Sequence, residues 1–182
     1  MIRYLRRAST GLGNSNWAVF CDRDGVLNQR IEGGYVVKPD QLHVLEIATP
    51  FLVAAQHAGA LVIIVTNQGC ISRGIATETE IMGINGSLLR ALEAQGVQAD
   101  AIYMCEHHPQ AIRPEDRECH CRKPKPGMLE QAKEDFRLSL GDSWFIGDTP
   151  SDRAAANAAG LPADRYVDVA TIGQHAVFWS RT

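Results

Sequence analysis

The sequence has no long hydrophobic run and no excess of basic residues. Its longest apolar stretches, such as Leu61–Val65, are far shorter than the about 20 residues that span a bilayer. Arg3, Arg6 and Arg7 near the start are not followed by an apolar segment of signal-peptide length. A formal net charge of −3 gives no general attraction to nucleic acid or to an anionic membrane. We therefore expect no membrane and no nucleic acid among the partners.

The sequence also has no repeat, low-complexity tract or linker. Its 182 residues, 45% hydrophobic and 21% charged, suit one globular domain with a substantial core. We expect a single domain over residues 1–182, present as a monomer. Residues 1–16 are predicted to be a flexible or extended segment whose arginines are solvated.

The cysteines are too unevenly placed for a disulfide framework. There are five, an odd number, and three lie beside histidines between residues 105 and 121. This clustering favours metal binding over disulfides and indicates a reducing compartment, the cytoplasm.

Short apolar runs alternate with segments of helical character along most of the chain. This pattern predicts an open, mostly parallel Rossmann-like α/β sheet flanked by helices. Thr49 is expected to cap one helix, and Thr77 with Glu80 forms a capping box for another. Strands are predicted at 17–21, 61–65, 101–104, 144–146 and from 166, and helices at 50–58, 78–95, 127–136 and 151–159.

Polar residues follow three of these strands. Parallel sheets bind ligands at the carboxyl ends of their strands. Asp22 follows the first strand, Thr66 and Asn67 the second, and Asp148 the fourth. The sequence therefore predicts one site to which three distant segments contribute.

The acids of this site suit phosphoryl transfer. Asp22 is a candidate nucleophile, and Asp24 a candidate general acid and base. Asp148 with Asp22 offers the hard oxygen ligands that Mg²⁺ prefers, and Asp152 could orient its water. The alternative is purely structural, with Asp24-Gly25 a turn and Asp148 or Ser151 a helix cap.

Neutral and basic groups could hold the phosphate. Thr66, Asn67 and Gln68 offer a hydroxyl, amides and backbone N–H groups, or else form a polar turn. Lys123 could offset the negative charge, although the pattern does not choose it over Lys125.

Three cysteines and one histidine form a second group, Cys105 with His107 and Cys119 with Cys121. Residues two apart in an extended chain face the same side, so each pair can bind one ion. Three thiolates and one imidazole make a closed, structural Zn²⁺ site over residues 105–121. The alternative is a reduced loop without metal.

These motifs together resemble the haloacid dehalogenase superfamily of aspartate-nucleophile phosphatases. Within it, the chain is most similar to the branch of heptose bisphosphate and histidinol-phosphate phosphatases. The resemblance covers residues 18–160 and is carried, in order, by FCDRDGVLN, GGYV, VTNQGCISRG, CEHHP, CHCRKPKPGM and FIGDTPSD.

The resemblance implies roles for individual residues. Asp22, the main-chain carbonyl of Asp24, and Asp148 would hold Mg²⁺. Thr66 and Asn67 would bind the transferred phosphate, and Lys123 would stabilise it. Arg122 would orient the sugar or its other phosphate, Tyr35 would line the pocket, and no large cap domain is expected. The chain departs from the branch at Gly69-Cys70, where Ser-Gly is common, and at Thr149, where lysine is frequent.

The expected activity is hydrolysis of a small-molecule sugar phosphate, the 7-phosphate of a D-glycero-D-manno-heptose 1,7-bisphosphate. Histidinol-phosphate hydrolysis is the alternative activity. A catalytically retired, zinc-stabilised interaction module is the alternative of another class.

Overall fold

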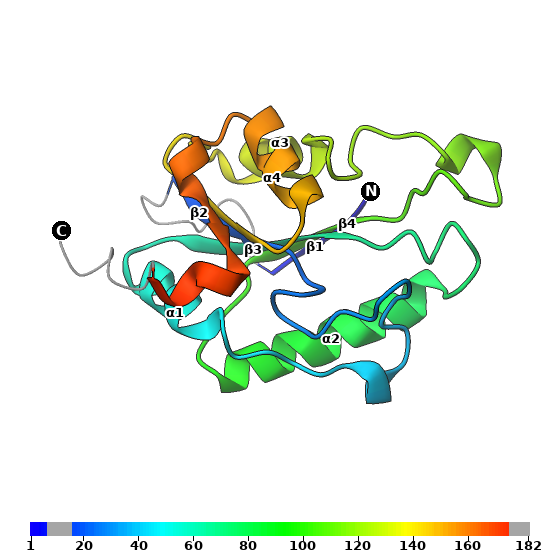
Figure 1. Cartoon of the computed structure of the whole chain (residues 1–182), viewed down its shortest axis with the longest axis horizontal. Coiled ribbons are helices and arrows are strands. Elements are labelled where there is room, and N and C mark those ends of the chain that lie inside the picture. Colours follow the sequence, from blue (N-terminus) through cyan, green and yellow to red (C-terminus); the bar gives the residue numbers. More distant parts are fainter. Residues whose placement is uncertain (7–15, 175–182) are drawn as a thin grey trace.

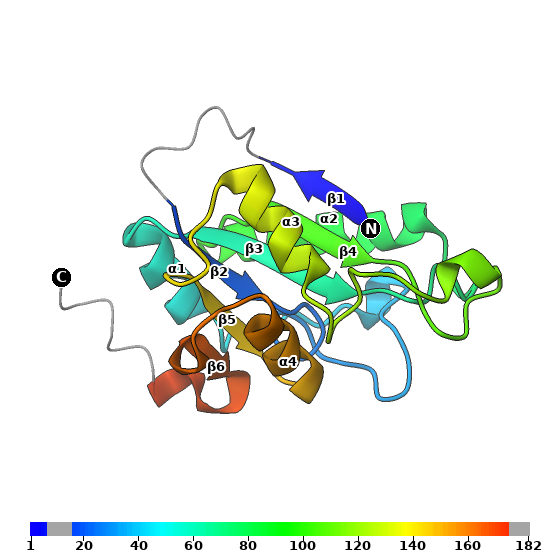
Figure 2. The same cartoon turned by 90° about the horizontal axis from the view of Figure 1, so that it is seen from above.

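A computed structural model of the protein describes residues 1–6 and 16–174. A six-stranded sheet, in the order β1-β4-β3-β2-β5-β6, forms its centre (Figures 1 and 2). All neighbouring strands are parallel except β1, which pairs antiparallel with β4. The strands are β1 (Ile2–Leu5), β2 (Ala18–Cys21), β3 (Leu61–Asn67), β4 (Ala101–Cys105), β5 (Trp144–Gly147) and β6 (Tyr166–Asp168).

Two pairs of helices cover the sheet. Helices α3 and α4 lie on one face and α1 and α2 on the other (Figure 1). The mostly parallel α/β architecture expected from the sequence is confirmed. The helices are α1 (Thr49–His57), α2 (Glu78–Ala94), α3 (Gly127–Phe136) and α4 (Pro150–Ala158).

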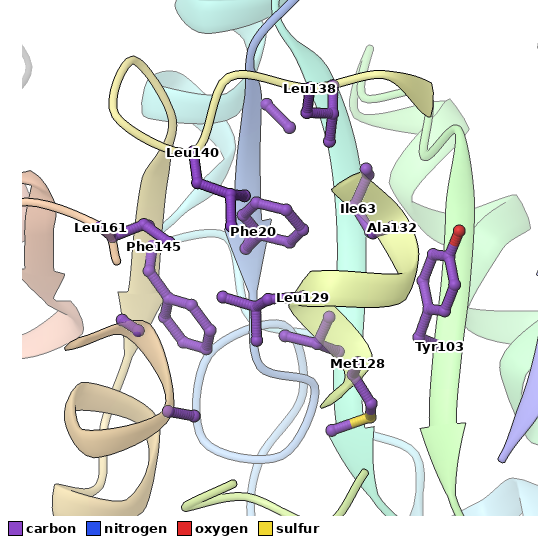
Figure 3. Close-up of a cluster of buried hydrophobic side chains, with 14 of the residues drawn as sticks. Phe20, Ile63, Tyr103, Met128, Leu129, Ala132, Leu138, Leu140, Phe145 and Leu161 are labelled. Carbon is purple, nitrogen blue, oxygen red and sulfur yellow. The ribbon is translucent and has the colours of Figure 1, made fainter. Parts of the chain in front are cut away.

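Each face of the sheet buries its own hydrophobic core. Beneath α3, Phe20 and Phe145 of the sheet pack with Leu129 (Figure 3). On the opposite face, Phe51 of α1 and Leu88 of α2 pack against the central strands. Because both faces are covered, every residue of β3 from Leu61 to Thr66 is buried, which is why this strand reads as a continuous apolar run.

The helix starts are set by capping residues. Thr77 caps α2 as predicted, since its hydroxyl accepts from the Glu80 N–H at 3.2 Å. The prediction for α1 is wrong by one residue: Thr49 lies inside the helix, and its hydroxyl donates to Gln95 instead. Thr149 caps α4, rather than Asp148 or Ser151.

The beginning of the chain is part of the sheet. Arg3 pairs with Asp135 of α3 at 2.9 Å, and Arg6 pairs with Glu93. Both arginine side chains are nevertheless exposed, as expected of solvated residues, and Ile2–Leu5 adopts the extended form predicted for this segment; Arg7 lies outside the described residues. Among the described helices, none has the length and apolar character required to cross a membrane.

Candidate active site

The carboxyl ends of β2, β3 and β5 open into one cleft. This is the edge at which the sequence predicts convergence, and the cleft has a volume of about 340 Å³. The acids Asp22 and Asp24 line it together with several basic and polar side chains. The lining residues are Asp22, Asp24, Arg30, Ile31, Glu32, Gly33, Gly34, Tyr35, Thr66, Asn67, Arg73, Lys123, Thr149 and Ser151.

Asp22 is held by a buried ion pair. Lys123 Nζ lies 2.8 Å from Asp22 Oδ1 and 2.6 Å from Asp152 Oδ1, and it donates to the Val65 carbonyl. Burial raises the pKa of Asp22 to about 7, with Lys123 opposing this and the neighbouring carboxylates adding to it. Additional positive charge at Asp22 would therefore favour its ionised, nucleophilic form.

Asp24 is held as a carboxylate by hydrogen bonds from three side chains. Arg23, itself fully buried, donates from Nε and Nη2 to the two carboxyl oxygens at 3.2 and 3.0 Å. Asn28 and Gln68 add bonds of 2.9 and 2.7 Å. Although burial acts in the opposite sense, the Arg23 charge and these hydrogen bonds lower the pKa of Asp24 below its usual value.

The predicted phosphate-binding residues occupy different positions. Thr66 and Asn67 line the cleft, and the Asn67 amide also makes two hydrogen bonds, of 3.0 and 3.1 Å, to the Lys123 main chain. Gln68 is fully buried and donates to Asp24 and to Thr66 Oγ1. The geometry thus gives Gln68 the task of orienting Asp24.

Asp22, Asp148 and Asp152 form a compact acidic group, with one oxygen from each lying within 4.8 Å of the others. Carboxylate oxygens are ligands suited to Mg²⁺. The backbone leaves room for the close approach of these acids at Gly25, where an added Cβ would lie 1.9 Å from Asp148 Oδ2. Burial raises the pKa of Asp148, and the Asp152 charge adds to this against the effect of Arg30. These features fit a divalent cation.

Asp152 performs two structural tasks in this group. Its carboxylate accepts from Thr149 Oγ1 at 2.6 Å and from the Thr149 N–H at 3.1 Å, and so forms the capping box of α4. It also pairs with Lys123. The Lys123 charge and these hydrogen bonds lower the pKa of Asp152, although burial alone would raise it.

The four predicted zinc ligands come together beside the cleft. Cys105 Sγ lies 3.7 Å from Cys119 Sγ and 3.9 Å from His107 Nδ1, and Cys121 Sγ lies 3.6 Å from the same nitrogen. Zn–S bonds of about 2.3 Å in a tetrahedron place the ligand atoms about 3.5–3.8 Å apart. The donor set and its spacing therefore fit structural zinc.

Arg122 packs against this Cys/His group. Its Nη1 donates to the His107 carbonyl at 3.1 Å, and its backbone N–H to Cys119 Sγ at 3.3 Å. It is absent from the cleft lining among the described residues, whereas Arg30 and Arg73 are present. Tyr35 lines the cleft as expected. The predicted contact of Arg122 with the sugar remains a prediction.

Sequence reasoning missed Arg23, Arg30 and Arg73. Arg23 stands between the two acids, which is a local signal for a counter-charge. No comparable signal marks Arg30, because its partner Asp148 is 118 residues away.

Fold and site together define a hydrolase of the haloacid dehalogenase type, with an aspartate at the end of the central strand. A family model described as HAD-hydrolase-like matches residues 120–167. The D-glycero-beta-D-manno-heptose-1,7-bisphosphate 7-phosphatase of Haemophilus ducreyi is 39% identical over 145 residues, which cover 79% of each chain. The D-glycero-alpha-D-manno-heptose-1,7-bisphosphate 7-phosphatase of Photorhabdus laumondii is 35% identical over 144 residues, covering 79% of this chain and 78% of that one.

A solved structure agrees with these relatives. The D,D-heptose 1,7-bisphosphate phosphatase of B. bronchiseptica, complexed with magnesium and phosphate, superposes with a TM-score of 0.74 and 29% identity, covering 87% of this chain and 97% of that one. The chain belongs to the D-glycero-D-manno-heptose-1,7-bisphosphate 7-phosphatase family.

Proposed function

We propose that the protein is a Mg²⁺-dependent phosphomonoesterase that removes the 7-phosphate of a D-glycero-D-manno-heptose 1,7-bisphosphate through an aspartyl-phosphate. The observation that carries the proposal is Asp22, which faces the cleft at a strand end, paired with Lys123 and next to Asp148. The names of the relatives support the choice of sugar.

The residues divide the first chemical step between them. Asp22 attacks phosphorus while the bond from phosphorus to the sugar oxygen breaks. Lys123 and the Thr66 hydroxyl offset charge on the phosphoryl oxygens. Asp22, Asp148 and the Asp24 carbonyl would hold Mg²⁺, which would supply charge neutralisation at the same oxygens.

Asp24 acts as the general acid and then as the general base. Because it is ionised in the free protein, it has to gain a proton before it can protonate the leaving oxygen. The approach of a phosphate dianion favours that uptake, since a nearby negative charge raises the pKa of a carboxyl group. Asp24 then accepts a proton from the water that hydrolyses the aspartyl-phosphate, which releases inorganic phosphate and restores Asp22.

The proposed zinc is structural and lies outside this chemistry. Cys105, His107, Cys119 and Cys121 would fill all four positions of a tetrahedral ion, so no open position remains for substrate. None of the five cysteines forms a disulfide bond, which is consistent with the reducing cytoplasm as the proposed location.

The test is phosphate release from both heptose bisphosphate anomers, with histidinol phosphate as the competing substrate. We expect the highest kcat/KM with a heptose bisphosphate and a loss of about 10³-fold or more in Asp22→Asn, which removes the nucleophile with little change of shape. Asp164→Asn, a similar change at an exposed position, is the control and should retain activity. Undiminished turnover by Asp22→Asn would rule out the mechanism, and a preference for histidinol phosphate would reassign the substrate.

A further inference from the structure

Arg30 contacts two of the groups that the proposed Mg²⁺ requires. It lies in the loop that follows β2, and its Nη2 lies 2.9 Å from the Asp148 carboxylate. The same nitrogen donates to the Asp24 main-chain carbonyl at 3.2 Å. A guanidinium therefore binds the carboxylate and the carbonyl that, with Asp22, would hold the metal.

We propose that Arg30 is a displaceable cation of the acidic group: in the metal-free protein it neutralises the Asp148 carboxylate and binds the Asp24 main-chain carbonyl, it leaves both when a divalent ion binds, and it then contacts the anionic substrate. The proposal rests on the proposed function and adds a specificity-determining residue to it.

The balance of charge supports the exchange. Four carboxylates, those of Asp22, Asp24, Asp148 and Asp152, meet three basic side chains, those of Arg23, Lys123 and Arg30. Exchange of Arg30 for a divalent ion leaves four positive charges facing four negative ones. A guanidinium and a divalent ion on the same two ligands would repel each other, so binding of one disfavours the other.

Burial indicates which cation can leave. The side chains of Arg23 and Lys123 are 0% and 2% exposed, and each is held by several partners. The Arg30 side chain is 34% exposed. Arg30 can therefore move without leaving a buried charge unpaired.

The cleft offers the released guanidinium a second role. Arg30 lines the same cleft as Tyr35, Arg73 and Lys123. Its planar set of N–H donors matches the oxygens of a phosphate group, and a bisphosphate carries one such group besides the one under attack. Arg30 would thus be available to the substrate after the metal is in place.

Calorimetric titration of the zinc-loaded protein with Mg²⁺, without substrate, tests the displacement. We expect Arg30→Gln to bind Mg²⁺ about tenfold more tightly than wild type, equivalent to about 1.4 kcal/mol. Arg73→Gln is the matched control, because it removes the same charge from the same cleft but has no bond to Asp148; we expect a change of about twofold or less. Equal Mg²⁺ affinities in wild type and Arg30→Gln, or equal gains in the two variants, would overturn the displacement.

Kinetics at saturating Mg²⁺ test the second role. Arg30→Gln should raise KM for the bisphosphate severalfold and change kcat less, and an unchanged KM would overturn the contact with substrate. If wild-type protein binds no Mg²⁺, the metal of the proposed function fails together with this inference. If wild type binds Mg²⁺ and Arg30→Gln behaves identically to it, the inference alone fails.

Discussion

At the scale of single residues, Gly25 controls how closely two loops of the site approach each other. Its φ of +97° lies in the left-handed region, which favours glycine. Asp148 occupies the space that a Cβ at this position would fill. Glycine at position 25, in the Asp24-Gly25 dipeptide, is therefore needed both for the turn and for the close approach of Asp148 to the other acids.

Gly25→Ala should greatly reduce Mg²⁺ affinity and phosphatase activity, because the new methyl group would push Asp148 aside. Gly59→Ala is the control: its φ is +91°, but nothing lies within 4 Å of an added Cβ. Both variants should lose about 1 kcal/mol of stability from backbone strain. Metal titration and thermal unfolding measure the two effects, and equal Mg²⁺ affinities in the two variants would show that contact with Asp148 is unimportant.

The residues that orient the acids were harder to foresee than the acids themselves. Asp22 and Asp148 stand directly after apolar strands, so their positions follow from the chain. A fully buried arginine such as Arg23 runs against the usual preference of this residue for solvent. Inside the fold its guanidinium also donates to Asn85, which lies 62 residues further along the chain. The direction in which Gln68 points depends likewise on the final fold.

At the scale of elements, one carboxylate links three segments of the sheet's edge. Asp135 of α3 accepts from Tyr103 of β4 at 2.7 Å and pairs with Arg3 of β1. Burial acts against ionisation, but the hydrogen bond from Tyr103 and the contacts with Arg3 and Gln131 lower the pKa of Asp135 below 3.8. The ionised carboxylate therefore stabilises the fold at neutral pH.

Asp135→Asn should lower the free energy of unfolding by about 1 kcal/mol at pH 7. A lowered folded-state pKa gives stability that is present above the unfolded-state pKa, near 3.8, and is lost as the pH falls through the folded value. The difference between wild type and variant should therefore shrink below about pH 4. Urea unfolding at a series of pH values measures it, and a difference independent of pH would show that the charge of Asp135 contributes nothing.

The segment between β4 and α3 has little apolar packing of its own. Most residues from Pro109 to His120 are exposed, so burial contributes little there. A metal that joins both ends of this segment would supply order that the composition does not.

Loss of zinc should accordingly destabilise this segment. His107→Ala should reduce the zinc content from about one ion per chain to a small fraction of that and lower Tm by several degrees. His120→Ala provides the matched control, because its ring faces Glu130 at 2.6 Å instead of the thiols. Elemental analysis and calorimetry give the answer, and full zinc occupancy in His107→Ala would remove His107 from the ligand set.

Strands at the edge of the sheet are harder to predict from hydrophobic patterns than buried strands. The buried strands β2 to β5 are visible as apolar runs because both their faces are covered. Strand β1 contains Arg3 and exposed residues, and it gains its place by pairing with β4. Four residues of mixed polarity carry no pattern that predicts pairing with β4, so this strand could not be foreseen from the sequence.

At the scale of the whole molecule, the sheet joins two cores and carries the cleft at one edge. The alternation of strands and helices was sufficient to predict this architecture, since a right-handed parallel arrangement leaves few alternatives. Because β2, β3 and β5 are parallel neighbours, their carboxyl ends meet at the same edge although they come from distant parts of the chain. The sequence thus predicts the location of the chemistry better than the finer choice of which side chains face the cleft.

Helix α2 shows how far the chemistry extends into the fold. No described residue of this helix lines the cleft. Asn85 Oδ1 nevertheless accepts a hydrogen bond from Arg23 Nη1 at 3.0 Å, and Arg23 in turn donates to the Asp24 carboxylate. In a library of random variants, a substitution at Asn85 would be scored as an ordinary core defect. The first consequence of such a substitution would be a misaligned Asp24, the proposed proton donor. Assays of folding alone would therefore underestimate the loss of activity.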